Sequence, residues 1–364
     1  MRPHNSRHSD LTRRRAQWVR AQKAGYVTLR RVVRALLVWG PPVSLLAICL
    51  VGFLIRLLVQ DRGSEFIADC YYVTPPIVLS GLVLAAGLSW LIARRWRLAA
   101  ATLAAGVGFL IWAYPYTWYD RAAAPAPTGS QRVLFWNVAH GVAGWTDIAA
   151  QLRARDPDII GLVESVRELP RLGHDLAAVR AELQQTASEM QVFWSEQMPQ
   201  YHAIVLSYGI SLLTKGELTQ VEDGYLAPNE RTAQGHYLHG QLATPTRTLH
   251  VIVVDVAYMP GTSRSGPFRD LNQLLATLDG EPVLLIGDFN TPTDSVFVEP
   301  LRARFLNAFE WAGQGYVATW PIPLPVLAID QAWFNAGVRV TRCVHGWSWA
   351  SDHRSVELDI SVAP

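Results

Sequence analysis

Three long runs without a charged residue constrain this chain more than any other feature of its sequence. They lie within residues 34–56, 69–94 and 97–120, whose first and last residues are charged, and they hold 21, 24 and 22 uncharged, largely apolar residues. A membrane-spanning helix needs about 20 mainly apolar residues, so each run is long enough. Buried helices of a large soluble core rarely run this far without a charge. We therefore predict an all-α transmembrane region of about three helices over residues 35–119.

The charge on either side of these runs indicates an orientation. Residues 1–34 carry ten Lys and Arg against one Asp, so this leader is +9, while the whole chain is only +2. Lys and Arg near the ends of membrane spans favour the cytoplasmic side. With three spans, the leader and the basic loop 94–97 are cytoplasmic, and everything after Tyr119 is extracytoplasmic. With two spans, the C-terminal part would be cytoplasmic instead. Arg56 ends the first run and would snorkel to the outer surface.

The remaining chain is predicted to be one α/β domain over residues 132–364, joined to the membrane region by a linker at residues 120–131 that is rich in Ala and Pro. Residues 121–364 hold 17 Lys and Arg against 25 Asp and Glu, a net charge of −8. An acidic domain without a basic stripe is not typical of proteins that bind nucleic acid strongly and without sequence preference. The periodicity predicts strands at 132–137, 159–164, 249–256, 283–287 and 355–360, and helices at 146–155, 176–190, 268–278 and 296–308.

Polar side chains recur where the predicted strands end. They are Asn137, Glu164, Asp288, Asn290, Asp330, Asp352 and His353. Each alone has an ordinary structural explanation, such as an Asx turn or a helix cap. A carboxylate left unpaired beside an apolar strand is costly, however, and α/β proteins place ligands at strand ends. Several such groups together would form an oxygen-rich site suited to Mg²⁺ or Mn²⁺.

The order of these residues resembles the endonuclease/exonuclease/phosphatase family, metal-dependent phosphoesterases related to pancreatic-type deoxyribonuclease. The matching segments are Phe135–Gly141 (FWNVAHG), Pro157–Glu164 (PDIIGLVE), Gly287–Asn290 (GDFN), Ile329–Asp330 and Ser351–His353 (SDH). GDFN and SDH are the most specific of them. The resemblance covers residues 131–362 and does not reach the apolar region. It implies a four-layer sandwich, in which two β-sheets are flanked by helices.

The resemblance also implies a role for each residue at the strand ends. Glu164 would be the main ligand of Mg²⁺ or Mn²⁺, with Asn137 beside it and Asp352 as a further metal contact. Asp288 would orient and deprotonate the attacking water, and Asn290 would donate a hydrogen bond to the phosphoryl oxygens. Asp330 and His353 would form a pair in which the carboxylate supports the positive charge of the imidazole, and His353 would contact the phosphate.

One position departs from the family pattern. Many members have a second histidine at the end of the strand that here reads VIVVDVAYMP, over residues 251–260. The Tyr-x-Pro sequence that starts at Tyr258 instead resembles the exonuclease III branch, in which a tyrosine occupies this neighbourhood. Tyr258 is therefore a candidate for stabilising the phosphate or protonating the leaving group. An aromatic side chain that packs at a strand end is the alternative.

The sequence thus predicts a membrane-anchored, metal-dependent phosphoesterase that acts on nucleic acid or on a phospholipid headgroup or small phosphoester. The lipid bilayer is the other expected partner, and nothing in the sequence indicates an oligomeric state. The absent histidine leaves open a catalytically silent domain that binds a phosphate-bearing ligand or a partner protein. A transport or sensing unit would need paired ionisable residues inside the apolar runs, which are absent. Cys70 and Cys343 would both face the oxidising side, as a disulfide or as free thiols.

Overall fold

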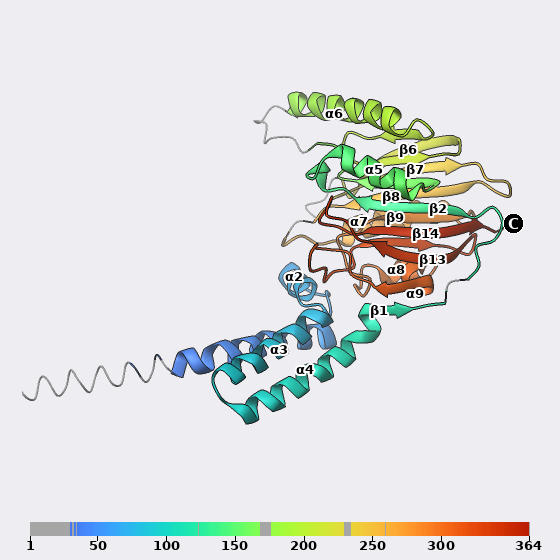
Figure 1. Cartoon of the computed structure of the whole chain (residues 1–364). Coiled ribbons are helices and arrows are strands. Elements are labelled where there is room, and N and C mark those ends of the chain that lie inside the picture. The colour runs from blue at the N-terminus through green and yellow to red at the C-terminus, as the bar shows by residue number, and fades with distance from the viewer. Residues whose placement is uncertain are drawn as a thin grey trace, which may run out of the picture. The chain divides into compact units, whose positions relative to one another are not determined.

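The computed structural model describes residues 30, 33, 35–122, 124–167, 176–228, 234–258 and 260–363. The predicted basic leader at residues 1–34 therefore lies almost wholly outside the described residues. The chain divides into two compact units (Figure 1). The helical unit comprises residues 1–53 and 78–112, and the α/β unit comprises residues 54–77 and 113–364.

The apolar runs form helices, as predicted. Two helices in the described part of the chain are long and apolar enough to cross a membrane, Ala35–Val59 and α4 (Trp96–Thr117). The first helix ends in a π-helical turn, η1 (Ile55–Val59). The second run is divided into α2 (Glu65–Val73) and α3 (Pro76–Ile92), and the chain bends by 67° between them. The described residues contain a third span by length only if these two helices together form a single span. The break coincides with two consecutive prolines, which disfavour helix at the preceding residue and remove backbone donors.

The α/β unit contains two mixed β-sheets. The eight-stranded sheet has the order β1-β11-β13-β14-β2-β3-β5-β4, and the six-stranded sheet has the order β10-β12-β9-β8-β7-β6. The bounds of the first set are β1 (Trp118–Asp120), β2 (Gln131–Asn137), β3 (Ile159–Val163), β4 (His202–Val205), β5 (Ser211–Thr214), β11 (Gly313–Tyr316), β13 (Val338–Gly346) and β14 (Ser355–Val362). Those of the second are β6 (Leu218–Leu226), β7 (Gly235–Leu242), β8 (Leu249–Val256), β9 (Val283–Asp288), β10 (Leu306–Asn307) and β12 (Asp330–Phe334).

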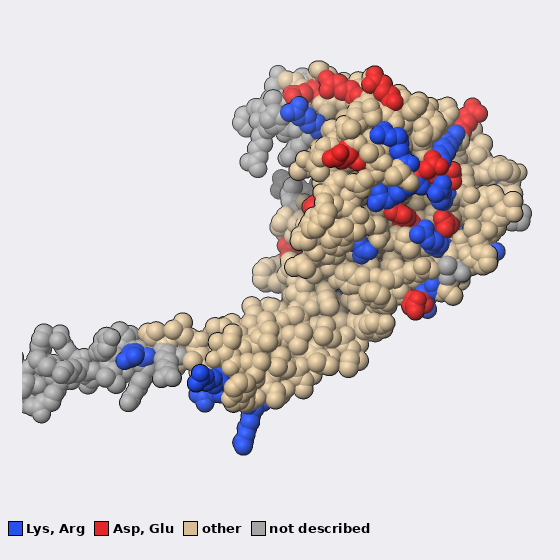
Figure 2. All heavy atoms as spheres, viewed as in Figure 1, with Lys and Arg blue, Asp and Glu red and all other residues tan. Residues whose placement is uncertain are grey.

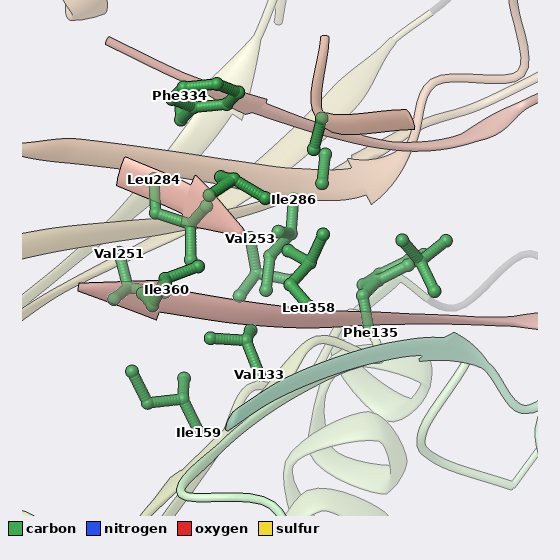
Figure 3. Close-up of a cluster of buried hydrophobic side chains, with 14 of the residues drawn as sticks. Val133, Phe135, Ile159, Val251, Val253, Leu284, Ile286, Phe334, Leu358 and Ile360 are labelled. Atoms are coloured by element: carbon green, nitrogen blue, oxygen red, sulfur yellow. The ribbon is translucent and has the colours of Figure 1, made fainter. Parts of the chain in front are cut away.

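Side chains of the central strands point alternately to the two faces of the sheet and so contribute to two separate layers of the core. Val133 and Phe135 of β2 face the other sheet, where they join Val251, Val253 and residues of β9 and β14 in one buried cluster (Figure 3). Leu134 and Trp136 face the opposite way, into a second buried cluster. Since successive side chains of a strand point to opposite faces, a continuous apolar strand can fill two core layers at once.

Helices cover the outer face of each sheet. On the eight-stranded sheet they are α5 (Trp145–Arg155) and α6 (Leu176–Gln197), whose buried Ile148, Leu152 and Trp194 pack on Leu134 and Trp136. On the six-stranded sheet α7 (Ser265–Ala276) packs Phe268 and Leu271 against β8 and β9, together with α8 (Glu299–Arg302). The predicted four-layer sandwich is therefore confirmed (Figure 1).

One predicted helix is wrong. Residues 296–308 form α8, the short strand β10 and the start of α9 (Ala308–Ala312) instead of one helix. α8 ends at Arg302, and a separate helix starts after Asn307, whose backbone is extended and whose side-chain oxygen accepts hydrogen bonds from the amides of Phe309 and Glu310. The cysteine alternatives are also resolved, since Cys70 and Cys343 are both free thiols.

The residues that join the first apolar helix to α3 belong to the α/β unit. We call residues 61–74 the interhelical segment. Asp61 is buried and accepts hydrogen bonds from the Ser295 hydroxyl, the Val296 amide and the Tyr72 hydroxyl. Asp69 accepts one from the amide of Gly261 at 2.9 Å. The interhelical segment is thus bound to the loops that follow β8 and β9.

Arg56 also joins these loops. Its guanidinium forms an ion pair with Asp294 at 2.6 Å and donates to the carbonyls of Tyr71 and Thr74. The Tyr71 hydroxyl donates to the carbonyl of Asp294 at 2.9 Å. A charge at the end of the first apolar run is therefore paired inside the protein.

Candidate active site

The strand ends named in the sequence analysis converge at one edge of the two sheets. β2 and β3 are parallel neighbours, so Asn137 ends one strand and Glu164 directly follows the other. In the second sheet β12 runs antiparallel to β9, which places Asp330 opposite Asp288. Because the sheets are stacked face to face, these ends meet across the sandwich. All of the predicted site residues belong to the α/β unit.

Asn137 connects the two sheets at the centre of this site. Its side-chain Nδ2 donates to Glu164 Oε1 and to Asp288 Oδ2, each at 3.0 Å. Its Oδ1 accepts from the Ala139 amide, which fixes the orientation of the side-chain amide. The side chain is fully buried. Two carboxylates from different sheets are therefore held on either side of one polar group.

Asp288 has the properties of a base that works near neutral pH. Burial raises the pKa of its carboxyl, and the neighbouring Asp330 raises it further, to about 7, while the His353 charge opposes the rise. Its Oδ1 accepts from the Asn290 amide at 2.8 Å, so the carboxylate is fixed in one orientation. When the pKa of a base is close to the working pH, a large fraction of the base is unprotonated and its affinity for a proton is still high.

Asp330 and His353 form the expected pair. His353 Nδ1 lies 2.8 Å from Asp330 Oδ2, and both side chains are buried. Burial by itself would lower the pKa of His353, but Asp330, Asp288 and Asp352 overcome this effect and raise it to about 10. The Trp136 indole donates to the His353 carbonyl at 3.0 Å and holds the loop in place. The imidazole is thus a positive group at neutral pH.

Four non-glycine residues that line the cavity have positive φ angles. They are Ala139 (47°), His140 (52°), Glu164 (50°) and Asn290 (44°). Such conformations cost energy for residues with a Cβ, and they cluster at functional sites. The Asn290 side chain donates to the carbonyl of Val256 at 2.9 Å, which ties the loop after β9 to the end of β8.

Tyr258 and Asp352 lie at the periphery. Tyr258 is 46% exposed, and its hydroxyl makes no hydrogen bond within the described part of the chain. The Asp352 side chain is half exposed and accepts from the Trp320 indole at 3.0 Å. Both residues nevertheless line the same cavity as Glu164 and Asp288.

This cavity has a volume of about 680 Å³ and gathers the site residues around one space. Of the predicted site residues, Glu164, Tyr258, Asp288, Asn290, Asp352 and His353 line it. Asn137 and Asp330 lie behind this lining and bind Asp288 and His353. The structure therefore brings the predicted residues together, six of them in the wall of the cavity and two directly behind it.

The donor set fits a hard divalent cation. Glu164 and Asp288 supply carboxylate oxygens on either side of Asn137, and Mg²⁺ and Mn²⁺ prefer oxygen ligands. The donor atoms of Asp288, Asp330 and His353 also lie within 4.8 Å of one another. Because His353 Nδ1 is bonded to Asp330, we assign this second group to the Asp–His pair rather than to a metal.

Several residues at the site were not predicted. Asp255 lies opposite Asp288 in the β8–β9 pairing, and burial together with the Asp288 and Glu164 charges raises the pKa of its carboxyl well above the usual range. It ends an apolar strand, so the rule that found Asp288 would also have found it. His140 Nε2 lies 3.4 Å from Glu164 Oε2, while its Nδ1 contacts the Val166 carbonyl. Tyr72, Val73 and Arg264, which also line the cavity, have no signal in the sequence.

Comparisons with known proteins agree with this geometry. The sequence pattern of the Endonuclease/Exonuclease/phosphatase family matches residues 134–353. A search of curated protein sequences finds no match. Among solved structures, a family protein from Bacteroides thetaiotaomicron is similar at TM-score 0.50 and 14% identity, over 68% of this chain and 100% of that one. The human Nocturnin catalytic domain is similar at TM-score 0.49 and 17% identity, over 67% and 97%.

The family match spans more than half of the chain and includes every segment on which the resemblance was based. The fold, the residues at the strand ends and the sequence pattern all agree. The chain therefore belongs to the endonuclease/exonuclease/phosphatase family, a family of phosphoester hydrolases.

Proposed function

We propose that this protein is a membrane-anchored, metal-dependent phosphoesterase that hydrolyses its substrate by in-line attack of water on phosphorus. The observation that carries the proposal is the link from Asn137 to both Glu164 and Asp288, with the Asp330–His353 pair beside it. A silent binding domain has no need of a carboxyl whose pKa is about 7 next to a buried imidazolium.

Each residue has a distinct part in the proposed reaction. Asp288 takes a proton from the attacking water as the new O–P bond forms and the ester O–P bond breaks. Asn290 and the positive His353 stabilise the negative charge that builds on the phosphoryl oxygens. Tyr258, which also lines the cavity, supplies a proton to the leaving oxygen in this proposal.

Glu164 would hold the metal ion, with Asp352 as a further contact. Asn137, expected from the sequence to be a ligand, would instead orient the Glu164 carboxylate, because its Nδ2 donates to Glu164 and its Oδ1 accepts from the Ala139 amide. A bound Mg²⁺ or Mn²⁺ supplies positive charge that polarises the phosphoester and lowers the pKa of water. Removal of the ion should therefore abolish turnover without unfolding the sandwich, whose core does not depend on it.

For the membrane we propose the arrangement that the charges indicate. The leader at residues 1–34 is cytoplasmic, residues 35–119 include the spans, residues 120–131 join them to the domain, and the domain over residues 132–364 is extracytoplasmic. The apolar character of Ala35–Val59 and of α4 supports the anchor. The third span of this arrangement would be α3 alone, whose 17 residues are at the lower limit of the length needed, because α2 belongs to the α/β unit. A reporter fused after the C-terminus is expected to be active only outside the cytoplasm, and a cytoplasmic signal would contradict the three-span arrangement.

The substrate is proposed to be a phosphoester at the membrane surface rather than long nucleic acid. Residues 121–364 carry a net charge of −8, and in Figure 2 acidic and basic side chains are interspersed over the visible face of the α/β unit without a basic stripe. The test is to assay the purified full chain in detergent with Mg²⁺ or Mn²⁺ on plasmid DNA, abasic DNA, sphingomyelin and phosphoinositides. We expect turnover of a lipid phosphoester that EDTA abolishes. Activity on none of them, or activity that survives EDTA, would contradict the proposal.

A further inference from the structure

Arg264 is a buried cation in the wall of the cavity. It is 2% exposed, and its guanidinium lies over two aromatic rings, 4.1 Å from the Tyr72 ring centre and 5.0 Å from that of Tyr258. Its Nε donates to the carbonyl of Asn290 at 3.1 Å. No carboxylate of the described residues forms an ion pair with it. A buried charge is normally paired, so this arrangement indicates a partner that arrives from outside the protein.

The surroundings of Arg264 suit a negative ligand. It is the one Lys or Arg among the described residues that line the cavity, whereas Glu164, Asp255, Asp288 and Asp352 all line it as acids. An anionic phosphoester in such a cavity needs fixed positive charge in addition to any metal. Within the described part of the chain, Nε is the only guanidinium nitrogen of Arg264 that donates a hydrogen bond, and a guanidinium with its two terminal nitrogens open to the cavity matches two phosphoryl oxygens in bidentate geometry.

The interhelical segment holds this arginine in position. Tyr72 stacks on the guanidinium, and its hydroxyl donates to Asp61 Oδ2 at 2.8 Å. Asp61 is in turn bound by Ser295 and Val296 in the loop after β9. The ring that covers Arg264 is thus fixed at both ends, by stacking on one side and by a buried hydrogen bond on the other.

We propose that Arg264 binds a phosphoryl oxygen of the substrate, and that Tyr72 of the interhelical segment is the residue that positions it. This inference rests on the proposed function and specifies how that site recognises negative charge. It makes the segment between the first two apolar helices part of the substrate pocket. Val73, which also lines the cavity, is three residues from Pro76 at the start of α3, so at most about 10 Å of chain separates this wall from the next apolar helix.

This connection assigns the chemistry of the substrate. The substrate is a phosphoester whose phosphate binds next to the interhelical segment, which is joined to the proposed membrane span α3 by only a few residues. A lipid headgroup and a small soluble phosphoester both carry such a phosphate. Arg264 is expected to contribute to the binding of either phosphate source, while the position of the wall favours the lipid.

The experiment measures the binding of inorganic phosphate to the full chain in detergent by calorimetry, which requires no turnover. Arg264→Met is expected to weaken phosphate binding at least tenfold, and Arg264→Lys, which keeps the charge, to recover part of it. Arg153→Met, an exposed arginine on α5 outside the cavity, is the matched control and should bind phosphate as the parent does. Equal phosphate affinity in Arg264→Met and the parent overturns the proposal.

Tyr72 is tested by a separation of KM from kcat. Tyr72→Leu removes the stacked ring and is expected to raise KM for p-nitrophenyl phosphate several-fold with kcat within about twofold of the parent, whereas Tyr72→Phe keeps the ring and should raise KM less. A KM unchanged in Tyr72→Leu overturns the positioning role. Circular dichroism melting identifies a variant that fails to fold, and Arg264→Lys and Tyr72→Phe then serve as the informative variants.

The failure of this inference can be told from failure of the proposed function. If the parent hydrolyses phosphoesters and Arg264→Met binds phosphate normally, only the assignment of Arg264 is lost. If the parent hydrolyses nothing and phosphate binding still depends on Arg264, the anion site stands and the enzyme proposal falls. Vesicles that contain phosphatidic acid, compared with p-nitrophenyl phosphate, decide the source, since a preference for the vesicles supports the lipid and a preference for the soluble ester overturns it.

Discussion

His353 Nδ1 lies 2.8 Å from Asp330 Oδ2, although the two residues are 23 positions apart: Asp330 begins β12 of the six-stranded sheet, and His353 lies in the loop before β14 of the eight-stranded sheet. This bond decides the chemistry of the imidazole. The Asp330 charge counters the burial that would otherwise lower the pKa of His353. His353 can therefore act as a fixed positive group beside the base Asp288.

Asp330→Asn should lower kcat by about 100-fold, because it removes the charge that keeps His353 protonated. The sign of the pH effect follows from the same bond. Activity that requires protonated His353 falls as pH rises through the pKa of that group, so the alkaline limb of the pH–rate profile should move to lower pH in the variant. Rates measured from pH 5 to 10 test this, and an alkaline limb at the parental position would contradict the assigned role.

Glu164→Gln should weaken Mn²⁺ binding by about 10- to 100-fold, because a neutral amide replaces the carboxylate assigned as the main metal ligand. Titration of the full chain with Mn²⁺, followed by electron paramagnetic resonance, measures this without turnover. Asp352→Asn should have a smaller effect, since that side chain is half exposed and already accepts a hydrogen bond from Trp320. Parental Mn²⁺ affinity in Glu164→Gln would rule out the assigned metal position.

The α/β unit should lose stability in mild acid because of buried histidines. Burial lowers the pKa of His345 to about 3 and that of His236 to about 4, below the unfolded value of about 6.5. Between these values the unfolded chain binds protons that the folded chain does not. The free energy of unfolding should therefore decrease as pH falls from 6.5, by up to about 1.4 kcal/mol per pH unit for each histidine.

Urea unfolding of the full chain at pH 7.5, 6.0 and 5.0 measures this slope. His345 stacks on Phe309 with a centroid distance of 4.1 Å, so His345→Gln should be less stable at neutral pH but show a shallower loss in acid. His202→Gln, at an exposed position on β4, is the control and should keep the parental slope. An identical slope in parent and His345→Gln would show that this histidine does not contribute.

Asp61→Asn should destabilise the contact between the interhelical segment and the loop after β9. All three groups bound to Asp61 are donors, from Tyr72, Ser295 and Val296, so an amide nitrogen at this position leaves a donor facing a donor. We expect a loss of about 1–3 kcal/mol in the free energy of unfolding. Glu65→Gln, at an exposed position in the first turn of α2, should change it by less than about 0.5 kcal/mol. Equal stability of the two variants would contradict the buried network.

Much of the site could be predicted because each of its polar residues at a strand end stands out within the sequence of its own strand. Asp288 follows an apolar strand, and an ionised group there needs a partner whatever the fold. Arg264 could not be found in this way. Its aromatic cover comes from Tyr72, 192 positions earlier in the chain, in a segment whose sequence is typical of a membrane helix. The apolar run predicted a span, but nothing in it indicated that its first residues form the wall of a cavity.

The helix predicted at residues 296–308 illustrates a second limit. Val298, Leu301 and Phe305 recur at helical spacing, and all three are buried against α7 and β9. Spacing alone could not show that Asn307 caps a separate helix, because the capping bonds become visible only in three dimensions.

The most direct test of the account is the rate at which the full chain hydrolyses bis(p-nitrophenyl) phosphate and p-nitrophenyl phosphate with Mn²⁺, in the parent and in Asp288→Asn. Asp279→Asn, an exposed carboxylate that pairs with Arg304, is the matched control. We predict that the parent and Asp279→Asn release p-nitrophenol from at least one ester, and that Asp288→Asn, folded as judged by circular dichroism, is at least about 100-fold slower. Equal rates in Asp288→Asn and the parent, or no hydrolysis by the parent, would contradict the account.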